Sequence, residues 1–210
     1  MHEADADAPV LTPEQSWSAI HATMEQARSA LHVAGATRIL LLWGAIASLG
    51  YLAEYLLATA GSSLADDAPW IRAPLWGLLV GAGIAGSAVI GHRAGRELAE
   101  GPGARAAGLR VFFFWLAVAA AAFLVPAAAG LWGADDATAT ARVAIGIVAL
   151  GYVLFGIVNH PLIAVVGAGI AAAYYLPSYL AGDLALALSA AGTLAVTALG
   201  AAWMRSTGAA

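Results

Sequence analysis

Six long apolar stretches constrain the fold of this chain more than any other feature. A helix needs roughly 20 apolar residues, within a range of about 17 to 25, to cross the hydrocarbon core of a bilayer. Strands are not expected, because membrane-spanning strands alternate apolar and polar residues, whereas these stretches are apolar on every face. The six predicted spans are Ile39–Ala60, Trp70–Gly91, Val111–Gly133, Arg142–Val158, Pro161–Leu180 and Leu184–Met204.

Composition excludes several classes of protein. Of the 210 residues, 61% are hydrophobic and 10% are charged, whereas about a quarter of an average soluble chain is charged. Too few charges remain to cover a surface in water, so a cytosolic enzyme is excluded. A net charge of −4 argues against a nucleic acid partner, and the absence of cysteine removes disulfides and thiolate chemistry. We therefore expect an all-α integral membrane protein, a six-transmembrane-helix bundle whose main partner is the lipid bilayer.

The arginines predict the orientation of the bundle. Short cytoplasmic loops carry an excess of Lys and Arg, and six crossings place seven of the nine arginines on one side, with only Arg72 and Arg142 on the other. Both termini are then cytoplasmic. All nine basic residues are Arg, which we interpret as the coding bias of a bacterial gene, so the expected location is a bacterial inner membrane. The seven arginines on the cytoplasmic side are Arg28, Arg38, Arg93, Arg96, Arg105, Arg110 and Arg205.

The residues before the first span predict a separate helix. Thr12-Pro13 is a typical helix start, with a capping side chain and a proline at the first helical position. Apolar residues then recur three and four apart and form one seam on a polar rod. Gly35 leaves two geometries open, a helix that continues into the first span and one that bends there. The docking seam, as we call it, comprises Trp17, Ile20, Met24 and Leu31.

This pattern divides the chain into four parts. We expect a disordered acidic tail over residues 1–11 and a cytoplasmic amphipathic helix over 12–37. The membrane domain follows over 38–205, and a short tail over 206–210 ends the chain.

Glu54 is the one charged residue well inside a predicted span. Burying a carboxylate there costs on the order of 2.5 to 3.5 kcal/mol on insertion scales, so it should face the bundle and have a partner. Arg72 and Arg142, at the outer ends of the second and fourth spans, are the two candidates. A proton or cation site is one interpretation. The others are a buried ion pair that fixes the first two helices, and a neutral Glu54 that is hydrogen-bonded to a tyrosine.

Two spans carry small residues at helical spacing, which lets helices approach closely in lipid. We therefore expect the second and fifth spans to be central in the bundle. The predicted packing residues are Gly77, Gly81 and Gly86 in the second span and Ala164, Ala168 and Ala172 in the fifth.

No catalytic or cofactor motif is present in the sequence. The HExxH pair of zinc proteases, the paired ExxH of di-iron bundles and the phosphate-binding GxxxxGK[ST] loop are all missing. We therefore expect no enzyme activity, no metal and no cofactor.

Two functions remain open on the sequence alone. The first is a regulatory or assembly subunit that docks a protein partner, or a second copy of the chain, through the docking seam. The alternative is a small-solute or ion transporter or channel, or the substrate-binding subunit of one, that uses Glu54.

Overall fold

The computed structural model describes residues 12–60, 69–97, 102–131 and 137–207, and within these ranges it contains helices and turns but no strands. Six of the helices are long and apolar enough to cross a membrane, which confirms the predicted number. The predicted tail over 1–11 lies outside the described residues. The long helices are α1 (Pro13–Thr59), α3 (Arg72–Glu97), α4 (Pro102–Ala128), α5 (Ala137–Asn159), α6 (Pro161–Leu180) and α7 (Ala185–Thr207), and η1 (Pro69–Ile71) and η2 (Gly182–Leu184) are short 3-10 helices.

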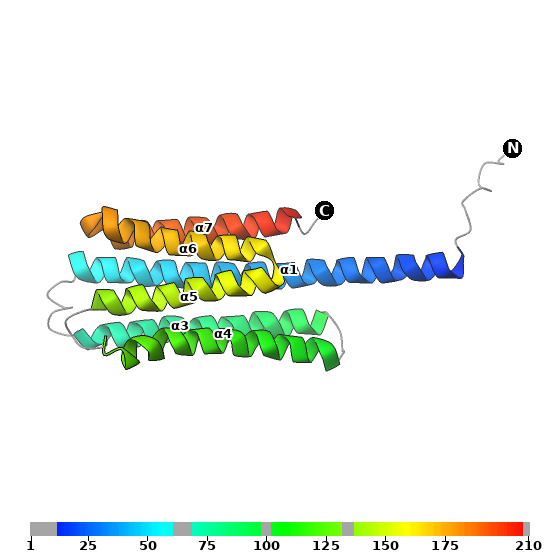
Figure 1. The fold of residues 1–210 in the computed structure, drawn as a ribbon, viewed down its shortest axis with the longest axis horizontal. Coiled ribbons are helices and arrows are strands. Elements are labelled where there is room, and N and C mark those ends of the chain that lie inside the picture. Colours follow the sequence, from blue (N-terminus) through cyan, green and yellow to red (C-terminus); the bar gives the residue numbers. More distant parts are fainter. Residues whose placement is uncertain (1–11, 61–68, 98–101, 132–136, 208–210) are drawn as a thin grey trace.

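Helix α1 is continuous over 47 residues, about 70 Å at 1.5 Å per residue. It begins beside Thr12, whose carbonyl accepts a hydrogen bond from the N–H of Ser16 at 2.8 Å. Gly35 lies inside this helix and does not end it. The amphipathic segment and the first apolar stretch are therefore one rod, and its N-terminal half projects beyond the bundle (Figure 1).

The helices form two rows of three. One row contains α7, α1 and α3, the other contains α6, α5 and α4, and α6 and α7 join the rows along one edge (Figure 1). Buried side chains from four of the helices pack together between the rows. This central cluster consists of Leu40, Tyr152, Val166, Ile170, Ala201 and Met204.

Helix α3 lies at the edge of the bundle and not at its centre, so the expectation drawn from its glycines is wrong. Only 6% of its apolar window is buried, against 33% for α1 and for α7. Its main neighbour is α1, and it makes little contact with α4. Small residues show which face of a helix permits close approach, but they do not show which helix fills that face.

The turn between α5 and α6 follows from its sequence. His160 has an extended backbone, as expected before a proline, and its Nδ1 accepts a hydrogen bond from the N–H of Leu162 at 3.3 Å. Pro161 starts α6, where a missing N–H costs nothing. Gly156 lies against the backbone of Ala164, and a side chain there would collide with it. The two helices can therefore run back along each other at very short range.

Helices α1 and α7 approach each other closely at Gly44. A Cβ atom at this position would collide with the side chain of Thr197, whereas nothing lies within 4 Å of a Cβ added at Gly81 on α3.

These two glycines predict opposite effects of the same substitution. Gly44→Ala should lower the stability of the bundle by about 1–3 kcal/mol because it overpacks the α1–α7 contact. Gly81→Ala should leave stability unchanged or raise it by up to about 1 kcal/mol, since alanine favours a helix more than glycine. Thermal unfolding in detergent measures both variants. Equal effects at the two positions would contradict the observed packing.

Candidate functional site

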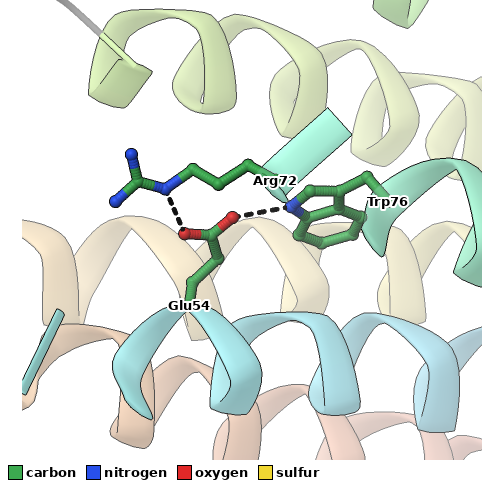
Figure 2. Close-up of polar contacts among 3 residues, drawn as sticks. All are labelled: Glu54, Arg72 and Trp76. Carbon is green, nitrogen blue, oxygen red and sulfur yellow. Dashed lines mark hydrogen bonds and ion pairs between the residues drawn. The ribbon is translucent and has the colours of Figure 1, made fainter. Parts of the chain in front are cut away.

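The candidate site surrounds Glu54, near the end of α1 that lies away from the projecting half. Glu54 Oε2 accepts a hydrogen bond from Nε of Arg72 at 3.0 Å, and Oε1 accepts one from the indole Nε1 of Trp76, also at 3.0 Å (Figure 2). The Glu54 side chain is 17% exposed and the Arg72 side chain is 38% exposed. Each carboxylate oxygen therefore has a donor, as a largely buried charge requires.

Helical spacing on two neighbouring helices builds this contact. Arg72 and Trp76 are four residues apart on α3, so both reach the same face. Gly50 lies one turn before Glu54 on α1, and the Trp76 ring occupies the space that a side chain at Gly50 would fill. The missing side chain at Gly50 thus allows the indole N–H to reach the carboxylate.

Arg142 was the other candidate partner of Glu54. It lies at the same end of the bundle but contacts different side chains. Its guanidinium carbon is 5.1 Å from the ring centre of Tyr179 on α6, which is a cation–π contact. The hydroxyl of Tyr175 donates a hydrogen bond to the backbone carbonyl of Arg142 at 2.6 Å. The single ion pair among the described residues is the one between Arg72 and Glu54.

Aromatic side chains connect the two arginine sites. The Tyr51 ring lies 6.3 Å from Trp76 and 5.6 Å from Tyr174, and Tyr174 lies 5.5 Å from Tyr175. Tyr51 and Tyr174 are almost completely buried. We call Tyr51, Trp76, Tyr174 and Tyr175 the tyrosine cluster, and it joins α1, α3 and α6.

The structure also shows a group of buried polar residues that the sequence analysis missed. Buried hydroxyl residues on α1 and α7 form what we call the hydroxyl seam. In α7 they recur every four residues, and this spacing was the available signal, because serine and threonine act as small residues between membrane helices. The hydroxyl seam consists of Thr37, Ser48, Ser189, Thr193 and Thr197.

Hydrogen bonding in the hydroxyl seam is uneven. Thr197 donates to the carbonyl of Thr193 at 2.8 Å, a common way to satisfy a hydroxyl within its own helix. Within the part of the chain that the structure describes, the hydroxyl oxygens of Ser48, Ser189 and Thr193 are buried without a hydrogen-bond partner. We find no group of three potential metal ligands among the same residues.

The predicted packing residues fall into two groups. Gly86 contacts Leu42 of α1, and Ala164 lies against Gly156, whereas a Cβ at Gly77 or Gly81 would meet nothing within 4 Å. Ala168 and Ala172 are exposed. On α6 the close contacts are made instead by Gly167, against Tyr152, and by Gly169, against Val196.

In the docking seam, Trp17 is 64% exposed. The side chains of Ile20, Met24 and Leu31 lie outside the described residues, although the backbone of α1 is helical at all three positions.

The geometry predicts that Glu54 is coupled to Arg72 and not to Arg142. In a double-mutant cycle, Glu54→Gln with Arg72→Gln should show a coupling of about 1 kcal/mol in detergent stability, a modest value because Arg72 is partly exposed. The control cycle, Glu54→Gln with Arg142→Gln, should be additive. A larger coupling in the control cycle would mean that Arg142 is the partner of Glu54.

Comparison of the chain with protein families, with curated proteins and with solved structures finds no match. The case for a function therefore depends on the residues and contacts described above.

Proposed function

We propose that the chain is a multi-pass protein of a bacterial inner membrane and that the projecting half of α1 docks a protein partner in the cytoplasm. The observation that carries this proposal is the continuity of α1 from Pro13 to Thr59. One unbroken helix joins an apolar stretch inside the bundle to a rod of about 33 Å outside it, at 1.5 Å per residue. A regulatory or assembly subunit needs such a firmly anchored recognition helix.

Exposed side chains support membrane insertion. Large apolar residues cover the outside of the bundle, among them Leu78, which is 75% exposed, and Leu199, which is 70% exposed. Monomeric soluble proteins rarely expose apolar surface on this scale. In a bilayer, lipid chains would cover these side chains, and no apolar surface would be exposed to water.

The distribution of charge supports cytoplasmic termini. Arg38, Arg93, Arg110 and Arg205 are all exposed, and their helices place them at the end from which α1 projects (Figure 1). An excess of arginine is typical of the cytoplasmic side. The projecting half of α1 is then in the cytoplasm, where a soluble partner can reach it.

A protein is a better candidate than the lipid surface for contact with the docking seam. Membrane-surface helices usually carry Lys and Arg on their polar face, but this segment has Glu14, Glu25, His21 and His32 against a single Arg28. The partner is a soluble protein or a second copy of the chain.

A transport role for Glu54 has less support. Both carboxylate oxygens already accept hydrogen bonds, from Arg72 and Trp76. A carboxylate that exchanges protons or cations needs a free oxygen in one of its states, whereas a fully paired one is suited to joining α1 and α3.

Reporter fusions test the orientation. Fusions at residues 65, 100, 136 and 205 should report outside, inside, outside and inside, respectively, because the arginine excess fixes the connection near residue 100 in the cytoplasm. Fluorescent and alkaline phosphatase reporters give complementary readouts. An outside signal at residue 100 would overturn the orientation.

Charge substitutions test the docking seam. Trp17→Glu combined with Leu31→Glu should abolish co-purification of a partner or of the oligomer, because two charges would have to be buried in an apolar contact. Membrane insertion should persist, since neither residue is in an apolar stretch.

The matched control is Ser18→Glu combined with His32→Glu, which places the same charges at the same separation one residue further along α1. This variant should assemble normally. The docking proposal is wrong if both variants assemble like the wild type, or if the isolated segment partitions onto anionic vesicles while assembly is unaffected.

A further inference from the structure

The described residues at the Glu54 end of the bundle include two arginines, Arg72 and Arg142, and two acids, Glu54 and Asp183, and only Arg72 and Glu54 form an ion pair. Arg72 is neutralised by Glu54, whereas Arg142 forms no ion pair within the described part of the chain. Asp183 on η2 is exposed and belongs to no ion pair there either. The Arg142 guanidinium therefore lies against Tyr179 without an ion-pair partner among the described residues.

Arg142 is held in position from two directions. The Tyr179 ring lies 5.1 Å from its guanidinium carbon, and the hydroxyl of Tyr175 binds its backbone carbonyl. Its neighbours on α5, Ala141 and Ile145, pack against the buried rings of the tyrosine cluster. The α5 backbone at Arg142 is thus held in place and the Tyr179 ring restrains the guanidinium, which lowers the entropy cost of binding.

The Nε atom of Arg142 is buried, and it has no hydrogen-bond partner among the described residues. A ligand from outside would therefore meet the terminal nitrogens of Arg142, whose side chain is only partly buried. Tyr179 is 68% exposed, so the ring over which the guanidinium lies is at the rim of the bundle, where a ligand can approach it.

We propose that Arg142 and Tyr179 form a binding site for a phosphate group. The planar fork of N–H donors in arginine matches the oxygens of phosphate, and the Tyr179 hydroxyl offers a further donor at the rim. A lipid headgroup or free phosphate could supply this group. The headgroup source rests on the proposed membrane insertion, because the site would then lie near the bilayer surface, whereas binding of free phosphate does not depend on insertion.

The test uses the full chain purified in an uncharged detergent. Its thermal stability is measured with inorganic phosphate, with phosphatidylglycerol and with diacylglycerol, which lacks the phosphate. A saturating phosphate-bearing ligand should raise the Tm by about 3 °C or more. Arg142→Gln should lose this shift, with an affinity at least about tenfold lower. Arg110→Gln, at the opposite end, is the matched control and should keep the shift.

The exposed Tyr179 provides a second variant that does not disturb packing. Tyr179→Ala should fold like the wild type and weaken phosphate binding. A shift with phosphatidylglycerol alone identifies the headgroup as the source, and a shift with inorganic phosphate as well identifies a site open to free phosphate.

Four results would overturn the proposal. The first is a wild type that no phosphate-bearing ligand stabilises, and the second is an Arg142→Gln variant stabilised as much as the wild type. The third is a shift of equal size with diacylglycerol. The fourth is binding that appears only after Asp135→Asn with Asp136→Asn, because the chain's own carboxylates would then occupy the site. The reporter fusions would reveal a failure of membrane insertion. The measurement with inorganic phosphate does not depend on insertion, so the two failures can be distinguished.

Discussion

Gly44 leaves room on α1 for the side chain of Thr197 on α7, and this close approach holds the first and last helices of the bundle together. Along the same contact lie the buried hydroxyls of Ser48, Ser189 and Thr193. In the proposed bilayer setting no hydrophobic effect would drive the association of helices, so close packing would have to supply the stabilisation. The rest of the structure depends on this contact, because α6 packs on α7 and α3 packs on α1.

The sequence predicted the number of long helices well, because apolar length depends on composition and needs no knowledge of neighbours. It could not predict which helix is central. The glycines of α3 mark a face that permits close approach, yet a Cβ atom at Gly77 or Gly81 would meet no described residue within 4 Å. The hydroxyl seam was missed because only glycine and alanine were considered as packing residues, whereas serine and threonine also pack as small residues between helices.

The sequence also could not predict which arginine pairs with Glu54. The sequence indicated that Glu54 needs a basic partner, but Arg72 and Arg142 were equally placed at the outer ends of two helices. The register of α3 against α1 decides between them, because Gly50 admits the Trp76 ring and the turn that carries this ring also carries Arg72. The register of two helices depends on how their side chains pack against each other. The spacing of residues within one helix gives no information about that packing.

Because α1 is unbroken, the direction of the docking seam is fixed relative to the other helices of the bundle. Successive residues of an α-helix are rotated by about 100° around the helix axis. Leu42, 25 positions after Trp17, therefore points in nearly the same direction as Trp17, whereas Gly44 points about 180° away from it. Leu42 contacts Gly86 of α3, while Gly44 contacts Thr197 of α7. A protein bound at Trp17 would therefore lie on the α3 side of the molecule, and the rotation of α1 about its axis would fix the orientation of that protein relative to the bundle.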